Sequence, residues 1–164
     1  MKFVSIIMGS KSDYEIMKNC SDTLQKFGVA HELIISSAHR SPERTKTYIK
    51  EAEAKGAQVF IAAAGMAAHL AGALASGTTK PVLGVPMESG PLRGEDALLS
   101  TVMMPAGMPV GTLAIGKAGA VNAAYLAVQI MALNDDELHI KLQEDRVSKA
   151  KKVELDSSEI EIRI

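Results

Sequence analysis

The stretch that decides the fold is Leu33-Ile34-Ile35-Ser36-Ser37-Ala38-His39-Arg40-Ser41-Pro42. Its apolar beginning predicts a strand, and Ser41 followed by Pro42 is typical of a helix start. The turn between them holds an imidazole beside a guanidinium. Because parallel α/β sheets bind ligands at the carboxyl ends of their strands, we interpret His39 as a candidate proton carrier and Arg40 as a candidate anchor for phosphate or carboxylate. The alternatives are a histidine that only stabilises the turn and an arginine that is a surface charge.

The same alternation of strand and helix continues on both sides of this stretch. Apolar runs predict strands at 3–8, 30–36, 58–64, 81–86 and 112–115. The helices are expected to begin at Ser12, which forms a capping box with Glu15, and at Ser41, and to cover 70–77, 95–102, 120–133 and 135–152. Such alternation implies βαβ units. We therefore expect an α/β fold, a three-layer α/β/α flavodoxin-like domain with a central five-stranded parallel sheet.

The chain has no sign of an internal domain boundary or repeat. We expect one catalytic domain over residues 1–152, including the last helix, and a tail over residues 153–164. Three isoleucines alternate with charged residues at the end of this tail, a pattern that suggests an extra strand at an edge or interface. They are Ile160, Ile162 and Ile164.

The composition excludes several classes of protein. The net charge of −1 gives no reason to expect nucleic acid or a membrane surface as a partner. Cys20 is the only cysteine, and the N-terminus lacks the long apolar core of a signal peptide, so we expect a soluble cytoplasmic protein. The four histidines lack the spacing of metal ligands, and we predict no metal site. Cys20 is expected to be a core thiol, and His31 and His139 to be structural or exposed.

Two further polar turns follow predicted strands and should share one sheet edge with His39. Gly9-Ser10-Lys11-Ser12-Asp13 opens a helix, where free backbone N–H groups favour an anion, although simple helix capping is an equally good interpretation. It matches neither the phosphate loop of nucleotidases nor the dinucleotide fingerprint. Asp13 would repel a phosphate, so its expected partner is a ribose hydroxyl. Gly65 to Leu70 contains His69 among small residues, where a buried structural histidine is the alternative.

Taken together, the turns resemble a known family. The motifs are Met8-Gly9-Ser10-Lys11-Ser12-Asp13, Ser37-Ala38-His39-Arg40-Ser41-Pro42, Ala64-Gly65-Met66-Ala67-Ala68-His69-Leu70, Pro81-Val82-Leu83-Gly84-Val85-Pro86, Met104-Pro105 to Gly111-Thr112, and Ala114-Ile115-Gly116-Lys117-Ala118-Gly119-Ala120. In this order they resemble the class I N5-carboxyaminoimidazole ribonucleotide mutases of de novo purine biosynthesis. The resemblance covers residues 4–142.

This resemblance implies conversion of N5-carboxyaminoimidazole ribonucleotide to 4-carboxy-5-aminoimidazole ribonucleotide without any cofactor. It implies a homo-octamer whose C-terminal helix packs on a neighbouring subunit, and functional coupling to the ATP-dependent synthetase that makes the substrate. His39 would be the proton carrier. The implied substrate-binding residues are Ser10, Ser12, Asp13, Ser37, Ala38, Arg40, Gly65, Ala68, His69 and Leu70.

The chain departs from the family pattern at three positions outside these residues. Met66 stands where a glycine is common, Ala71 where a proline is common, and Met103 where a glutamine often precedes Met-Pro. The nearest rival function is the class II aminoimidazole ribonucleotide carboxylase, which uses carbon dioxide directly, but its pattern typically has lysine after the histidine. A non-catalytic flavodoxin-like binding module is a more distant alternative. The few aromatic residues and the lack of an acidic cluster argue against a flavin or phosphoryl-receiver module.

Overall fold

A computed structural model shows the five predicted strands in one parallel sheet, and the structure describes residues 1–160 and 162. The strands follow the order β2-β1-β3-β4-β5. Both the parallel five-stranded sheet and the flavodoxin-like order are confirmed. The strands are β1 (Phe3–Met8), β2 (His31–Ile35), β3 (Ala57–Gly65), β4 (Val82–Met87) and β5 (Gly111–Thr112).

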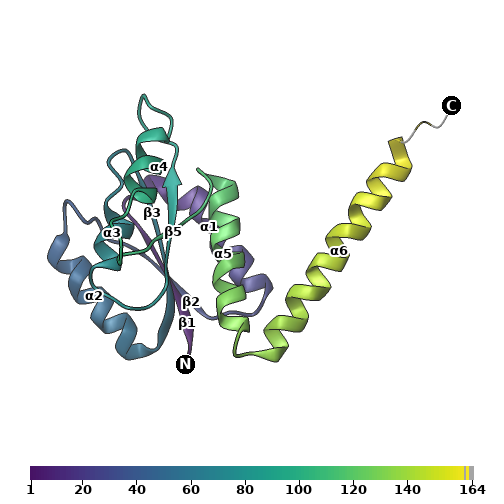
Figure 1. Cartoon of the computed structure of the whole chain (residues 1–164), viewed down its shortest axis with the longest axis horizontal. Coiled ribbons are helices and arrows are strands. Elements are labelled where there is room, and N and C mark those ends of the chain that lie inside the picture. The colour runs from purple at the N-terminus through teal and green to yellow at the C-terminus, as the bar shows by residue number, and fades with distance from the viewer. Residues whose placement is uncertain (161, 163–164) are drawn as a thin grey trace.

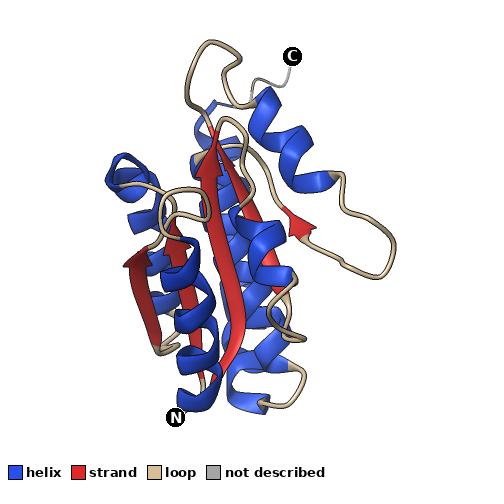
Figure 2. Cartoon of the chain, turned by 90° about the vertical axis from the view of Figure 1, so that its left-hand side faces the viewer, coloured by secondary structure: helices blue, strands red, loops and turns tan. Residues whose placement is uncertain are grey.

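Helices cover both faces of the sheet, which gives the three layers predicted (Figures 1 and 2). One face packs against α1 (Tyr14–Lys26) and α5 (Lys117–Ala132). The other packs against α2 (Pro42–Lys55), α3 (Leu70–Ala75) and α4 (Glu95–Val102). A short 3-10 turn, η1 (Lys11–Asp13), precedes α1.

The sheet divides the core in two, and every residue of its strand β1 is buried. Because successive side chains of a strand point to opposite faces, Ile6 joins the cluster under α1 and α5 while Ile7 joins the one under α2 and α3. Burying each of these side chains stabilises the fold by about 1.5–3 kcal/mol. Near β4, an added Cβ on Gly84 would lie 2.4 Å from Thr101 Cγ2, so this glycine lets α4 approach the sheet closely.

The last helix, α6 (Asp136–Ile160), differs most from the sequence prediction. It does not end near Lys152, and residues 153–160 are helical rather than a tail or an edge strand. The segment 153–160 contains neither glycine nor proline, so nothing in it stops the helix. Ile162 has no regular structure, and Ile164 lies outside the described residues. Figure 1 shows α6 leaving the body of the domain as an arm.

Asp145 fastens the first half of α6 to the body, because its carboxylate accepts hydrogen bonds from three side chains. These are Lys26 on α1, Tyr125 on α5 at 2.8 Å, and Lys149 on α6 at 2.9 Å. Burial alone would raise the pKa of Asp145, but the bonds from Lys26, Lys149 and Tyr125 outweigh it and bring the pKa to about 2. Leu138 and Leu142 pack into the core beside this cluster.

Two other element boundaries differ from the prediction. The strand expected at 112–115 is only Gly111–Thr112, because it pairs with Leu83 and Gly84 of β4 alone and the chain then bends into the α5 start. The helix expected over 120–133 begins earlier, because α5 starts at Lys117. Within the part of the chain that the structure describes, no helix is both long and apolar enough to cross a bilayer.

Candidate active site

Three loops meet at the carboxyl edge of the sheet, where β2, β1 and β3 end side by side. The loop after β2 touches the loop after β1 through Arg40, whose Nη2 donates to the Gly9 carbonyl oxygen at 3.0 Å. It touches the loop after β3 through a hydrogen bond between His39 Nε2 and His69 Nδ1. The prediction that these turns share one edge is therefore confirmed.

The loop after β1 is organised by Ser10 rather than by Ser12. Ser10 Oγ accepts from the Ser12 backbone N–H at 3.3 Å and from Ser12 Oγ at 3.0 Å. The Ser10 N–H donates to Asp13 Oδ2 at 3.1 Å, which completes a capping box around η1. The predicted box between Ser12 and Glu15 is wrong, because the tighter turn begins two residues earlier than the expected helix.

Asp13 is the buried member of this loop, with 7% of its surface exposed. Burial raises the pKa of its carboxyl, while the Ser10 N–H, the charge of Arg40 and the Ser12 hydroxyl lower it in part, and the net direction is upward. The carboxylate has acceptor capacity beyond its bond to Ser10, as a ribose hydroxyl would require. Asp13 thus holds the loop together and places an acceptor near the arginine.

The loop after β2 is closed by hydrogen bonds between Ser37 and Ser41. The Ser41 N–H and Oγ both donate to the Ser37 carbonyl, at 2.8 and 3.1 Å, and the Ser37 N–H donates to Ser41 Oγ at 3.0 Å. Ser41 stands at the predicted start of α2, but its hydroxyl turns back into the loop and does not cap the helix. The Arg40 N–H donates to Ser37 Oγ at 3.1 Å. These bonds hold His39 and Arg40 in neighbouring positions, while Ala38 lies half-buried between them and Ser37.

The two histidines form an exposed pair with ring centroids 4.6 Å apart and planes at 81°. One ring nitrogen must donate and the other accept, so a neutral pair or a singly protonated pair keeps the bond, whereas a doubly protonated pair loses it. In the singly protonated pair, the charged ring donates and the neutral ring accepts. This arrangement suits a group that must give and later take a proton near neutral pH.

The loop after β3 needs a glycine at its start because another loop packs on it. An added Cβ on Gly65 would lie 1.9 Å from Ser89 Oγ, in the loop between β4 and α4. Ala68 and Leu70 are buried and support the loop from beneath, while His69 is exposed. Ser89 is a residue that the sequence analysis missed, and only the position of Gly65 at a strand end could have indicated a close neighbour.

The remaining candidates have structural roles. His31 bonds to Ser21 Oγ at 2.7 Å and to the Val29 carbonyl at 2.9 Å, and His139 lies exposed on α6 beside Gln143. Cys20 is fully buried, and burial raises the pKa of its thiol to about 12, so it is a core residue as predicted. Among residues 1–160 and 162, no three His, Cys, Asp or Glu side chains gather as metal ligands would.

A flavodoxin-like domain with a histidine pair and an arginine at the carboxyl edge of its sheet defines the class: an α/β protein whose ligand-binding edge carries side chains of the kinds suited to an anion and to proton transfer. The chain belongs to the AIR carboxylase family, whose model matches residues 3–152.

Relatives in three bacteria are similar over nearly the whole chain, and all three are named N5-carboxyaminoimidazole ribonucleotide mutase. The Brucella melitensis protein is 53% identical over 92% of this chain and 93% of its own. The Escherichia coli K12 protein is 50% identical over 92% and 89%, and the Bacillus subtilis protein is 50% identical over 95% and 96%. The crystal structure of Treponema denticola PurE superposes with a TM-score of 0.89 and 28% identity, covering 99% of this chain and 100% of that one.

Proposed function

We propose that this protein is an N5-carboxyaminoimidazole ribonucleotide mutase, which forms 4-carboxy-5-aminoimidazole ribonucleotide in de novo purine biosynthesis. The observation that carries the proposal is the hydrogen-bonded pair of His39 and His69 beside Arg40. The names of the relatives from Brucella melitensis and Bacillus subtilis give the substrate. The side chains at the site are of the kinds that such a reaction needs, which supports the proposal.

In this proposal the loops after β1 and β2 bind the ribonucleotide. Ser10, Ser12 and Arg40 supply hydroxyls, backbone N–H groups and a guanidinium fork for the phosphate, and Asp13 accepts from a ribose hydroxyl. Ser37 orders the loop through Arg40, as its hydrogen bonds indicate. The imidazole ring and its carboxyl group would then lie against Ala38, Gly65 and His69, with Ala68 and Leu70 buried beneath them.

His39 is the proton carrier in the proposed mechanism. It donates a proton to the exocyclic nitrogen as the carbamate C–N bond breaks and carbon dioxide is released beside the ring. The electron-rich ring carbon attacks the carbon dioxide and forms the C–C bond, and the ring proton returns to His39. His69, which shares a hydrogen bond with His39, orients that ring and spreads its charge. Holding carbon dioxide and the ring together supplies the advantage of proximity.

One assay pair tests this function against its alternatives. The purified protein is given the N5-carboxylated ribonucleotide in one reaction, and aminoimidazole ribonucleotide with a low concentration of bicarbonate in the other, and the C4-carboxylated product is measured. We expect rapid product formation in the first and little in the second. The reverse result would favour a class II carboxylase, and turnover of neither substrate would favour a non-catalytic binding module.

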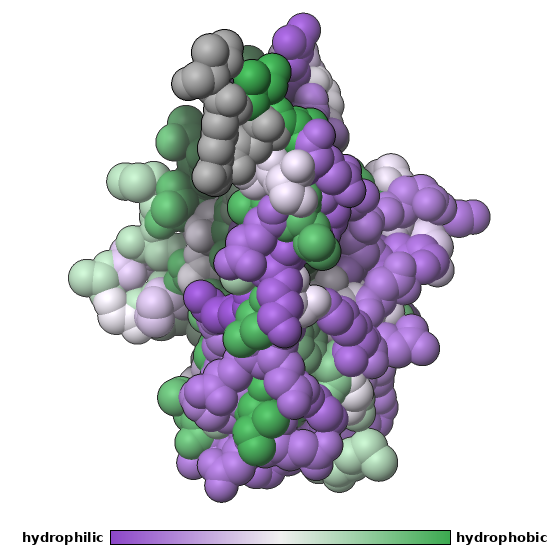
Figure 3. Space-filling view, turned by 90° about the vertical axis from the view of Figure 1, so that its right-hand side faces the viewer, coloured by the Kyte–Doolittle hydropathy of each residue, from purple (hydrophilic) through white to green (hydrophobic). Residues whose placement is uncertain are grey.

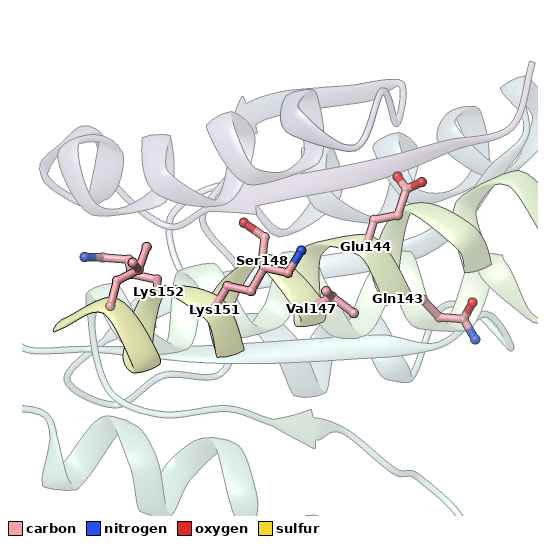
Figure 4. A pocket seen from close by; sticks show the side chains of 7 residues that line it. Gln143, Glu144, Val147, Ser148, Lys151 and Lys152 are labelled. Carbon is pink, nitrogen blue, oxygen red and sulfur yellow. The ribbon is translucent and has the colours of Figure 1, made fainter. Parts of the chain in front are cut away.

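We further propose that α6 packs on a neighbouring subunit of a homo-octamer. Its outer half exposes a set of large apolar side chains, and in Figure 3 such green side chains stand among purple ones on this face of the molecule. They are Val153, Leu155 and Ile160, and Val147 is a further exposed apolar side chain nearer the body. A surface hollow next to them is lined by α6 alone, as Figure 4 shows, so its opposite wall is open to a second chain.

The remaining parts of the proposal concern organisation in the cell. Residues 1–152 would form the catalytic domain, since the family match covers almost the same range. The protein would act in the cytoplasm, where the ATP-dependent synthetase makes its carbamate substrate. Activity at low concentrations of free substrate in the presence of that synthetase would support this coupling.

A further inference from the structure

Two buried hydroxyl groups connect the two ends of the turn that carries His39 and Arg40. Ser36 directly follows β2 and is 2% exposed, and Thr45, the fourth residue of α2, is 3% exposed. Their hydroxyl oxygens lie 2.8 Å apart. A buried hydroxyl costs free energy unless it has a hydrogen-bond partner, and these two side chains are partners for each other.

The direction of this hydrogen bond follows from the other contact of the Thr45 hydroxyl, which donates to the Ser41 carbonyl at 3.2 Å. Because a hydroxyl has one proton, the Ser36 hydroxyl is the donor to Thr45. The Ser36 N–H in turn donates to the Met8 carbonyl of β1 at 2.9 Å. A chain of hydrogen bonds therefore runs from the sheet through Ser36 and Thr45 to Ser41, at the far end of the turn.

The position of α2 at this end depends on that chain of hydrogen bonds. Ser41 does not cap the helix, because its hydroxyl donates to the Ser37 carbonyl. A cavity of about 310 Å³ lies between α2 and α3, and Ala38, Pro42 and Thr45 are among the residues that line it. On this side the turn borders open space rather than packed side chains, so hydrogen bonds must hold it.

We propose that Ser36 and Thr45 are positioning residues whose hydrogen bond holds the turn of His39 in place. This inference rests on the proposed mutase function, in which His39 gives a proton to one atom of the substrate and takes one from another. Both transfers require a well-placed ring, and a displacement of about 1 Å can cost about 10²-fold in rate. Arg40 depends less on this bond, because it also donates to the Gly9 carbonyl.

The test compares substitutions that remove or keep the bond in the full-length protein. Ser36→Ala and Thr45→Val each remove it, their combination removes both hydroxyls together, and Thr45→Ser keeps it. Thr101→Val is the matched control, because Thr101 is also buried and its hydroxyl also donates to the carbonyl four residues earlier, in α4. For each variant kcat and KM are measured with the N5-carboxylated ribonucleotide, together with the midpoint of chemical denaturation and amide hydrogen exchange of residues 37–41.

We expect kcat to fall about tenfold in Ser36→Ala, in Thr45→Val and in the double variant, with KM within about threefold of the wild-type value. The double variant should lose no more than the single variants, because all three lack the same bond. Its denaturation midpoint should lie nearer the wild-type value than that of Thr45→Val, which leaves the Ser36 hydroxyl buried without an acceptor. Thr45→Ser and Thr101→Val should keep kcat near the wild-type value.

Three results would overturn the inference. The first is a wild-type kcat in both single variants. The second is a loss of kcat in Thr45→Ser as large as that in Thr45→Val, because the hydroxyl would then be irrelevant. The third is a kcat that follows the denaturation midpoint and recovers in the double variant, because the bond would then stabilise the fold without positioning the turn.

The exchange measurement separates this inference from the function on which it rests. The N–H groups of Arg40 and Ser41 donate within the turn, so they are protected while the turn keeps its shape. Exchange in residues 37–41 should be about tenfold faster in Ser36→Ala and Thr45→Val. If the wild-type protein lacked mutase turnover, the proposed function would fail while this difference in exchange remained. Unchanged exchange in both variants would overturn the positioning role regardless of activity.

Discussion

The carboxyl edge of the sheet and the outer half of α6 are held in different ways. At the edge, loops far apart in sequence are joined within one chain by hydrogen bonds such as Arg40 to Gly9 and His39 to His69. Beyond Lys149, α6 leaves the body, and its apolar side chains are exposed (Figure 1). The difference teaches that contacts within this chain hold the loops of the candidate site together, whereas the outer half of α6 extends away from the body with its apolar side chains exposed.

The sharpest test of the edge is His39→Asn. Asparagine can still hydrogen bond but does not carry a proton near neutral pH, so turnover should fall by about 10³-fold. Binding of the ribonucleotide, measured by calorimetry, should change little. His139→Asn, on the exposed face of α6, is the matched control and should keep full activity. Turnover near the wild-type level in His39→Asn would remove it as the proton carrier.

The corresponding test of α6 is Leu155→Glu. If this exposed leucine is buried by a neighbouring subunit, a carboxylate there should cost at least about 3 kcal/mol per subunit and the assembly should dissociate. Light scattering coupled to size-exclusion chromatography would report the mass. Ser158→Glu adds the same charge at an exposed polar position as a control. An unchanged mass for Leu155→Glu would place the interface elsewhere.

A smaller effect is expected from Arg40→Ala at the edge. Losing charge-assisted hydrogen bonds to the phosphate should cost about 2 kcal/mol, which is a rise in KM of roughly 30-fold with a smaller change in kcat. Arg44→Ala removes a nearby exposed arginine from α2 and should leave KM unaltered. Equal KM values for Arg40→Ala and the wild type would contradict its role as the anchor.

The smallest effect tests the point where α6 meets the body. Because the folded-state pKa of Asp145 is about 2 and lies below its ordinary value of 3.8, the carboxylate contributes about 2 kcal/mol of stability above pH 4. This contribution is lost as the pH falls from about 4 to 2. Asp145→Asn should lower the free energy of unfolding at pH 7 by about this amount and by much less near pH 2.

Chemical denaturation of the wild type and Asp145→Asn at several pH values measures this difference. Asp156→Asn, whose carboxylate pairs with Lys152 in the exposed half of α6, is the matched control. A difference that stayed constant between pH 7 and pH 2 would show that the charge of Asp145 is not what stabilises the contact.

The loops at the carboxyl edge of the sheet could be predicted from the sequence because the patterns that indicate them are local. Each apolar run ends in a polar turn, and parallel pairing carries the turns to one edge whatever lies between them. The sequence could not predict contacts between loops that are distant along the chain. Examples are the packing of Ser89 against Gly65 and the hydrogen bond from Arg40 to the Gly9 carbonyl oxygen. The cap at Ser10 was missed because Ser12 with Glu15 matched the same pattern two residues later.

The wrong prediction of a tail or edge strand after Lys152 has a different physical origin from the missed cap at Ser10. Three isoleucines spaced two apart suggested a strand, but a strand requires a partner, and a helix satisfies its own backbone groups without one. From Val153 onward the sequence offers helix-compatible residues and no stop signal, so the helix continues to Ile160. A two-residue spacing of apolar side chains is a weak guide to a strand where no neighbouring strand is at hand to pair with it.

The hydrogen bonds of Asp145 fix one point of α6 to the body of the domain, and that point acts as a pivot for the rest of the helix. Some fifteen residues separate Asp145 from Ile160, and at 1.5 Å per residue the arm beyond the pivot is about 22 Å long. A rotation of about 5° at the pivot would therefore move the tip by about 2 Å, more than enough to misalign an interface. The donors on α1 and α5 set the direction in which α6 leaves the domain, and the Asp145 carboxylate joins both of them to the helix.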